Sequence, residues 1–234
     1  MKDTEERVFK MEETQKRKYN TVVFDLDGTL LDTLADLTDS VNAVMRQYQI
    51  PEHTTDEVRR FVGNGIRKLI ERAVPQGCAN LQYEEIYHAF TEYYGAHCME
   101  KTEPYPGIIA LLDWLKKEGY QVAIVSNKAD FAVKKLNQVY FGSLIRVAIG
   151  EREGIRKKPA PDTVFQALKE LRADAAHAVY IGDSDVDVET ARNSGMDGIA
   201  VSWGFRSREF LLEHGADPEW IAANVNEVKA FLQK

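Results

Sequence analysis

The stretch Thr21-Val-Val-Phe-Asp-Leu-Asp-Gly-Thr29 decides the fold of this chain. Its first four residues form a short apolar run rich in β-branched side chains, which is typical of a strand buried on both faces. The run ends in two aspartates, a glycine and a threonine, which are residues that favour turns. The sequence therefore predicts a buried strand whose carboxyl end carries acidic side chains.

Similar short apolar runs recur along the chain, and segments with helical periodicity alternate with them. The further expected strands are Gln121–Val125, Ile145–Ile149, Ala178–Ile181 and Gly198–Val201. The expected helices between and after them are Ile108–Lys117, Asp162–Leu171 and Asp187–Arg192. For the first of these, Pro106 precedes the helix and Gly119 follows as a C-cap residue. Repeated strand–helix units predict a doubly wound (Rossmann-like) α/β fold with a parallel sheet.

One region departs from this alternation. Between about residues 34 and 102 the patterns are helical only, with Pro51, Gly63, Gly65 and Pro75 as turn signals. The expected helices are Leu34–Tyr48, Thr55–Val62, Ile66–Val74 and Tyr83–His97. We therefore expect an inserted α-helical cap at 34–102, on a core formed by 19–33 and 103–234. Residues 1–18 are expected to be an exposed, charged N-terminal extension.

Composition and charge exclude several classes of function. The chain has 234 residues, of which 44% are hydrophobic and 29% charged, as in a folded globular protein. It carries 30 Lys+Arg against 37 Asp+Glu, a net charge of −7, which argues against a nucleic-acid or anionic membrane partner. No apolar run is long enough for a membrane helix, and the first residues do not resemble a signal peptide. Only two cysteines, Cys78 and Cys98, are present, which is too few for a disulfide scaffold, so we expect a cytoplasmic protein. The sequence leaves the oligomeric state open.

Polar side chains follow four of the expected strands. Asp25 and Asp27 come after the first, Ser126-Asn127-Lys128 after the second, Lys157-Lys158 after the third and Gly182-Asp-Ser-Asp-Val-Asp187 after the fourth. Ligands of open α/β sheets bind at the carboxyl ends of the strands, so these groups should converge on one crevice. The gathered carboxylates would repel one another without a cation, and their hard oxygens suit Mg²⁺.

The spacing of the first two acids suggests a division of roles. Asp25 and Asp27 are two residues apart at a strand end, so their side chains can lie on the same side of the chain. One can then act as a nucleophile and the other as a general acid/base. A lysine, a hydroxyl and a metal are groups that suit phosphoryl transfer, whose transition state is rich in charge.

In order and in context, DLDGTLLDT, SN, KKPAP and GDSDVD resemble the four motifs of the haloacid dehalogenase-like superfamily, and the helical insert resembles its small α-helical cap. The resemblance implies that Asp25 attacks phosphorus and that Asp27 protonates the leaving oxygen and then activates water. It implies that Ser126, Asn127 and Lys158 bind the phosphoryl group. The implied ligands of Mg²⁺ are the Asp25 carboxylate, the Asp27 backbone carbonyl and Asp183, with Gly28, Thr29 and Asp187 in supporting positions.

Within the superfamily, the chain resembles the phosphoglycolate phosphatase branch. Three stretches show this resemblance: Val62-Gly-Asn-Gly65, Gly150-Glu-Arg-Glu153 and Trp203-Gly-Phe-Arg206. The implied activity is Mg²⁺-dependent hydrolysis of a small phosphorylated metabolite, 2-phosphoglycolate being the leading example, through an aspartyl-phosphate intermediate. The candidates for binding the rest of the substrate are Asn64, Arg67, Lys128 and Arg206.

Several alternatives remain open from the sequence. A phosphosugar mutase of the β-phosphoglucomutase type or a pyrophosphatase would use the same scaffold, and a non-catalytic phospho-ligand-binding protein would keep the fold. Ser126 or Asp187 can be explained as a helix cap, and Gly63-Asn-Gly65 as the turn that opens a helix. We predict that Lys157 is a surface charge, and that the tyrosines of the last cap helix, including Tyr94, belong to the cap's own core.

Overall fold

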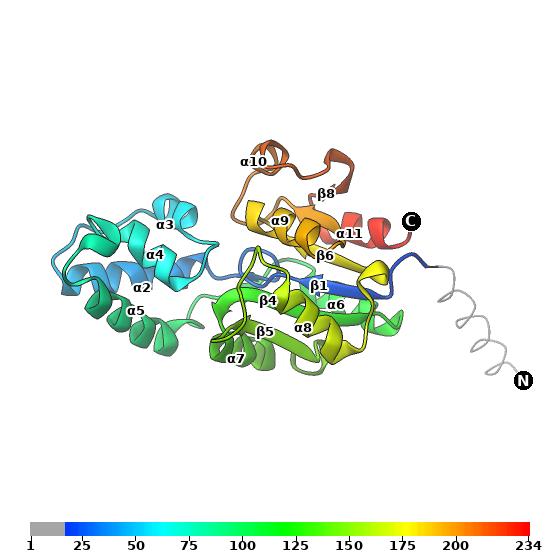
Figure 1. Cartoon of the computed structure of the whole chain (residues 1–234), viewed down its shortest axis with the longest axis horizontal. Helices are drawn as coiled ribbons and strands as arrows, with labels where there is room; N and C mark the ends of the chain where they lie inside the picture. The colour runs from blue at the N-terminus through cyan, green and yellow to red at the C-terminus, as the bar shows by residue number, and fades with distance from the viewer. Residues whose placement is uncertain (1–16) are drawn as a thin grey trace, which may run out of the picture.

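A computed structural model describes residues 17–234, and its central feature is a six-stranded sheet in which every neighbouring pair is parallel. The strand order is β5-β4-β1-β6-β7-β8 (Figure 1). The strands are β1 (Thr21–Phe24), β4 (Gln121–Ala129), β5 (Val147–Glu151), β6 (Ala178–Gly182), β7 (Asp197–Val201) and β8 (Ile221–Ala222). The chain adds β4 and β5 on one side of β1 and the last three strands on the other. The predicted doubly wound α/β fold is therefore confirmed, with the switch in strand order at β1.

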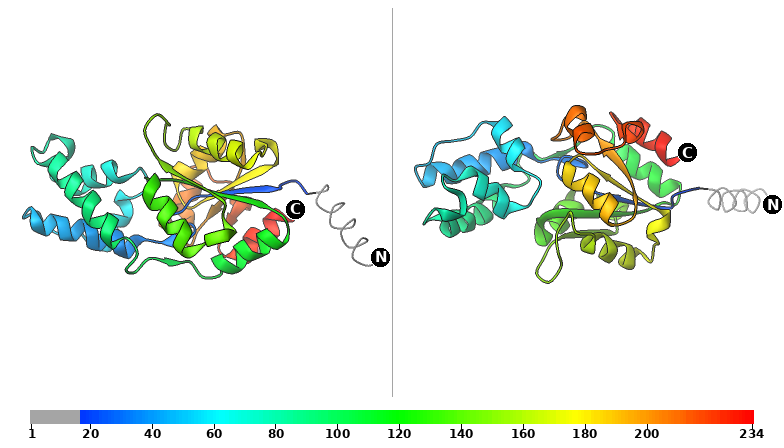
Figure 2. Two further views of the ribbon diagram at one scale, coloured as in Figure 1. Left: turned by 90° about the horizontal axis from the view of Figure 1, so that it is seen from below. Right: turned by 45° about the horizontal axis from the view of Figure 1, so that its top comes forward.

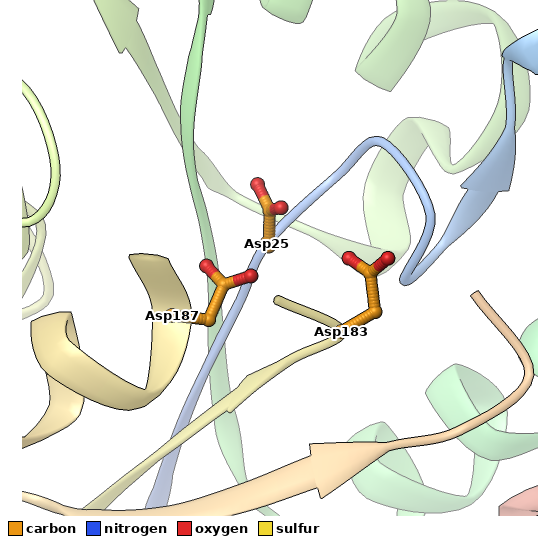
Figure 3. A group of neighbouring side chains, drawn as sticks. All are labelled: Asp25, Asp183 and Asp187. Carbon is orange, nitrogen blue, oxygen red and sulfur yellow. The ribbon is translucent and has the colours of Figure 1, made fainter. Parts of the chain in front are cut away.

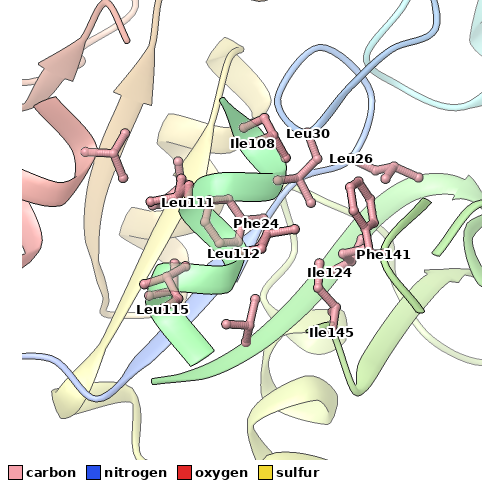
Figure 4. Close-up of a cluster of buried hydrophobic side chains, with 14 of the residues drawn as sticks. Phe24, Leu26, Leu30, Ile108, Leu111, Leu112, Leu115, Ile124, Phe141 and Ile145 are labelled. Carbon is pink, nitrogen blue, oxygen red and sulfur yellow. The ribbon is translucent and has the colours of Figure 1, made fainter. Parts of the chain in front are cut away.

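Helices cover both faces of this sheet. One face is covered by α6 (Ile108–Lys117), α7 (Asp130–Tyr140) and α11 (Val225–Leu232), and the other by α8 (Asp162–Leu171) and α9 (Asp185–Asn193). The period of a strand explains this, since Val22 and Phe24 face the first layer while Val23 faces the second. Figure 4 shows Phe24 packed among the leucines of α6. The remaining short elements are α10 (Arg208–Glu213), η2 (Gly142–Leu144), η3 (Ala175–His177) and η4 (Pro218–Trp220).

The segment between β1 and β4 contains the four helices expected there. They are α2 (Leu34–Gln47), α3 (Thr55–Phe61), α4 (Ile66–Ala73) and α5 (Tyr83–His97), with η1 (Gly77–Ala79) between the last two. They form a separate lobe (Figure 2) that contains its own cluster of buried hydrophobic side chains. Of the buried residues in this cluster, Phe205 alone comes from the core. Burial of an independent apolar core is what makes a segment a domain. On this packing we propose that 34–102 is a cap, the name used below for these residues.

The two chain segments that connect the cap to the core pair with each other. Strand β2 (Leu31–Asp32) lies antiparallel to β3 (Glu103–Pro104). Beside this pair, the buried Asp36 carboxylate accepts hydrogen bonds from the backbone N–H groups of Lys101 and Thr102 and from the Thr102 hydroxyl, at 2.7–2.9 Å. The sequence did not predict this small sheet, because two-residue strands carry no periodic signal.

The predicted N-terminal extension falls mainly on residues 1–16, which lie outside the described residues. Of its last two residues, Arg17 pairs with Glu118 at 2.6 Å and Lys18 with Asp197 at 2.9 Å. These two residues therefore contact the core instead of extending away from it. Within residues 17–234, none of the helices combines the length and the apolar character that crossing a membrane requires.

Candidate active site

The polar residues predicted to converge do so at the carboxyl edge of the sheet, around the switch in strand order. Asp25 follows β1, Ser126 and Lys128 lie at the end of β4, and Asp183 follows β6. Together with Lys158 from the loop after β5, they line a cavity of about 50 Å³. The cap closes the other side of this cavity with apolar side chains from α2 and α4, namely Leu37, Ile66 and Leu69.

Lys158 is the buried cation at the centre of the site. Its Nζ lies 2.8 Å from Asp25 Oδ1, 2.8 Å from Asp187 Oδ1 and 3.0 Å from the Tyr180 hydroxyl oxygen. Its neighbour Lys157 is half-buried and contacts the backbone carbonyl of Asn64 at 3.1 Å. The choice of Lys158 over Lys157 therefore agrees with the geometry, although Lys157 touches the cap and is more than a surface charge.

Burial and the neighbouring negative charges shift the pKa values of the acids in this site. Burial raises the pKa of Asp25 to about 7, repulsion from Asp187 adds to the rise, and Lys158 opposes it. Burial, followed by repulsion from Asp187 and Asp25, raises the pKa of Asp183 well above its usual range. Burial on its own would lower the pKa of Lys158, but Asp187 and Asp25 outweigh it and raise the pKa. The protein therefore holds more negative charge here than Lys158 can neutralise.

Three buried carboxylates could hold a cation at this point. Oxygens of Asp25, Asp183 and Asp187 all lie within 4.8 Å of one another, and Figure 3 shows the three side chains grouped together. Asp25 Oδ1 is buried and lies 2.8 Å from Lys158 Nζ, and no other described residue donates a hydrogen bond to this oxygen. Buried carboxylate oxygens that outnumber the cations around them fit a divalent cation with a preference for oxygen ligands.

The roles of the three acids differ because their hydrogen bonds differ. Both oxygens of Asp187 are occupied, one by Lys158 and the Tyr180 hydroxyl, the other by the Ser184 N–H and hydroxyl. Asp187 thus orients Lys158, as expected. Asp187 also caps α9, as the alternative held: Ser184 is the N-cap, and Asp187 is the third residue of the capping box, whose side chain accepts from the Ser184 N–H.

Gly28 and Thr29 hold Asp183 in place. Gly28 has φ +85°, and a Cβ at this position would overlap the Asp183 carboxylate. The Thr29 hydroxyl donates to Asp183 Oδ1 at 3.1 Å, and the Phe205 N–H donates to Asp183 Oδ2 at 2.7 Å. The glycine after Asp27 is therefore required both by its left-handed backbone and by the close approach of Asp183.

Asp27 also lines the cavity and is held by two donors. Its Oδ1 accepts from the Thr33 hydroxyl at 2.8 Å and from Lys128 Nζ at 2.9 Å, and its Oδ2 lies 3.2 Å from the same Nζ. Lys128 Nζ is also 2.5 Å from the hydroxyl oxygen of Tyr94, in cap helix α5. Tyr94 belongs to the cap core as predicted, but it also lines the cavity. No sequence signal marked this second position, since only the docking of the cap brings α5 to the site.

Ser126 and Asn127 also lie where the motifs predicted. Ser126 is buried within β4, whereas the next helix, α7, begins at Asp130, so the helix-cap alternative for Ser126 was wrong. The Asn127 amide donates to the backbone carbonyl of Lys158 at 3.0 Å and to that of Gly63 at 3.2 Å. Asn127 therefore connects the loop that carries Lys158 to the cap.

The four candidates for binding the rest of the substrate divide into two groups. Lys128 and Arg206 line the cavity, and Arg206 reaches the cap by donating to the carbonyls of Arg59 at 2.6 Å and Val62 at 2.8 Å. The structure does not bring the other two to the cavity. Arg67 is exposed and pairs with Glu84, and the Asn64 side chain accepts from Arg72 in the turn before α4.

Known proteins share both this fold and this sequence pattern. A model of the family described as haloacid dehalogenase-like hydrolase matches residues 22–201. The chain is 34% identical over 201 residues to the phosphoglycolate phosphatase of Caulobacter vibrioides, covering 84% of each chain. It is 30% identical over 189 residues to that of Aquifex aeolicus, covering 79% of this chain and 85% of the relative.

Solved structures agree with these relatives. A crystal structure of a candidate phosphoglycolate phosphatase from Lactobacillus delbrueckii subsp. bulgaricus superposes with a TM-score of 0.88 at 37% identity, covering 92% of this chain and 98% of that one. CbbY from Rhodobacter sphaeroides, in complex with phosphate, superposes with a TM-score of 0.74 at 27% identity, covering 90% and 96%. Together the comparisons support assignment as a phosphatase, and with the family model matching most of the sequence, the chain belongs to the haloacid dehalogenase-like hydrolases.

Proposed function

We propose that this protein is a Mg²⁺-dependent phosphomonoester hydrolase that acts through an aspartyl-phosphate on Asp25. The observation that carries the proposal is the state of the Asp25 carboxylate, which is buried, lines the cavity, and has one oxygen 2.8 Å from Lys158 Nζ with no hydrogen bond from any other described residue. A carboxylate in this state is poorly solvated and free to react as a nucleophile.

In the first half of the proposed reaction, an Asp25 oxygen attacks phosphorus and the ester P–O bond breaks. Asp27 gives its proton to the departing alcohol oxygen. Lys158 and Ser126 hold the phosphoryl oxygens as charge develops on them. A bound divalent cation, with Asp25 and Asp183 as its side-chain ligands and the Asp27 carbonyl as a third, would neutralise phosphoryl charge.

In the second half, water attacks the aspartyl-phosphate. Asp27, now a carboxylate, takes the proton of the attacking water, the P–O bond to Asp25 breaks, and phosphate leaves with Asp25 restored as a carboxylate. The Thr33 hydroxyl and the Lys128 ammonium hold the Asp27 carboxyl group in position for this proton transfer. The cap shields the cavity from bulk water during both halves.

The proposed substrate is a small phosphorylated metabolite with a second anionic group, such as 2-phosphoglycolate. Lys128 and Arg206 supply positive charge in the wall of the cavity, which suits a second anionic group. The curated relatives named above are phosphoglycolate phosphatases, which is consistent with this choice. We propose the cytoplasm as the location.

The test is a screen for phosphate release from small phosphorylated metabolites with and without Mg²⁺, using the wild-type protein and two variants. Asp25→Asn should abolish turnover, whereas the control Asp185→Asn, at the start of α9 in the same acidic motif, should stay within about threefold of wild type. Turnover by Asp25→Asn near the wild-type rate would exclude the nucleophile. If no metabolite released phosphate with Mg²⁺, a non-catalytic phospho-ligand-binding protein would become the better explanation, and return of an isomer without phosphate would indicate a mutase.

A further inference from the structure

Tyr94 is a cavity residue for which the proposed chemistry has no use. It lies near the C-terminal end of cap helix α5, and its side chain is buried, as is that of Lys128 opposite it. Its ring stacks on Phe90, with centroids 5.5 Å apart and planes at 9°, so the position of the hydroxyl is fixed by packing. The ammonium of Lys128 lies 2.5 Å from that hydroxyl oxygen and 4.6 Å from the ring centroid.

The direction of this hydrogen bond follows from the donors available. A lysine ammonium can only donate, so the Tyr94 oxygen must accept, and the hydrogen of the Tyr94 hydroxyl is left for another partner. Among residues 17–234 no acceptor receives that hydrogen. A buried O–H group without an acceptor is unusual, and the adjacent positive charge of Lys128 makes it a stronger donor.

The ligand that fits this donor is an anion. The groups assigned to the phosphoryl end are Asp25, Ser126, Asn127, Lys158 and Asp183, and most of the rest of the wall is apolar. On the basis of the phosphatase function proposed above, we propose that Tyr94 determines specificity: its hydroxyl donates to a carboxylate oxygen of the substrate whose phosphoryl group lies at Asp25. The charge of Lys128 beside it favours a carboxylate over a neutral tail.

The location of Tyr94 on the cap gives this contact a second consequence. The phosphoryl group is held by the core and the carboxylate by the cap, so a short substrate with both groups bridges the two parts. Such a bridge stabilises the closed cavity and excludes water from the reacting atoms. A phosphomonoester of equal length but without the anion forms only the core half of the bridge.

The test compares two substrates of equal chain length, 2-phosphoglycolate and propyl phosphate, in three forms of the full-length protein. These are the wild type, Tyr94→Phe and a matched control, Tyr83→Phe. Tyr83 lies on the same helix and loses one hydrogen bond in the variant, from its hydroxyl to the Arg67 backbone carbonyl at 2.8 Å, outside the cavity. The readout is the ratio of kcat/KM for 2-phosphoglycolate to kcat/KM for propyl phosphate.

We expect Tyr94→Phe to lower this ratio by about 10- to 100-fold, the range for one hydrogen bond to a charged group, and Tyr83→Phe to leave it unchanged. A parallel loss on both substrates would mean that Tyr94 is structural and would overturn the proposal. So would a wild-type enzyme that hydrolyses both substrates equally well, in which case the phosphatase function would stand. A wild-type protein that hydrolyses no phosphomonoester would overturn both.

Discussion

Replacing Lys158 by methionine is the most direct way to test how the site balances its charge. The substitution keeps an unbranched side chain of similar length but removes two ion pairs, to Asp25 and Asp187, each at 2.8 Å and fully buried. Loss of one partner from a buried pair leaves an uncompensated charge and costs about 3–5 kcal/mol. For a chain of this size, even 3 kcal/mol corresponds to a fall in Tm of roughly 6–12 °C.

The same substitution removes a donor that holds the phosphoryl oxygens in the transition state. Loss of one such preorganised group lowers kcat by about 10²–10³-fold. We therefore expect Lys158→Met to be both less stable in EDTA, measured by thermal unfolding, and at least 100-fold slower on 2-phosphoglycolate with Mg²⁺. The matched control is Lys157→Met, which removes a half-buried amine that contacts the cap and Glu151 but none of the carboxylates paired with Lys158, and which should keep kcat within a few-fold.

Two outcomes would refute this reasoning. If Lys157→Met lost kcat and Lys158→Met did not, the wrong lysine would have been assigned to the phosphoryl group. If Lys158→Met lost neither stability nor kcat, the buried acids would have to be neutral in the folded protein. In that case the charge argument for a cation at Asp25 would also fail.

Three further predictions concern the metal, the cap and the first turn. The pKa of Asp25 is raised to about 7 from an ordinary 3.8, so its ionisation destabilises the metal-free fold increasingly from about pH 4 to pH 7. Because a bound cation needs the ionised form, the rise in Tm on adding Mg²⁺ should be larger at pH 8 than at pH 5, as measured by differential scanning fluorimetry. Arg206→Met removes two hydrogen bonds to the cap, including that to Val62, and should raise KM several-fold with an increased radius of gyration in solution scattering. Gly28→Ala should abolish activity and lower Tm, because a methyl group there displaces Asp183, whereas Gly154→Ala in an open loop should retain activity.

Much of the core fold could be predicted from the sequence because its signals are local. The expected helices at 108–117 and 162–171 match α6 and α8, and all five expected strands are present, although β4 runs four residues beyond the expected end at Val125. Helices α7, α10 and α11 were not predicted, and the three missed strands have weak or no local signals. Strand β8 has two residues, and β2 and β3 exist only because the two cap connections meet. Their pairing depends on the tertiary structure, which no periodic pattern in a single segment can express.

In the site, too, the residues that belong to local motifs could be predicted from the sequence, whereas those that depend on long-range contacts could not. The positions of Asp25, Asp183 and Lys158 follow from strand ends, since a parallel sheet brings its carboxyl ends to one edge. Tyr94 could not be found in this way, because its distance from Asp27 depends on how the cap docks. Arg67 shows the converse: a basic residue after a glycine-rich turn was a reasonable candidate, but α4 turns it away to pair with Glu84. The cap side of the site therefore requires a structure.

The net charge of the chain was a poor guide to the ligand of this site, because the charges around the cavity differ from those of the surface as a whole. The acidic excess of −7 would repel a phosphorylated metabolite from the surface as a whole. Around the cavity, the four carboxylates of Asp25, Asp27, Asp183 and Asp187 face three cationic side chains, Lys128, Lys158 and Arg206, which leaves one negative charge. One divalent cation more than cancels this remainder. The cation then leaves Lys158 and the donors of the cap free to bind the charge of the substrate, so metal binding and anion binding should be mutually dependent, with each strengthening the other.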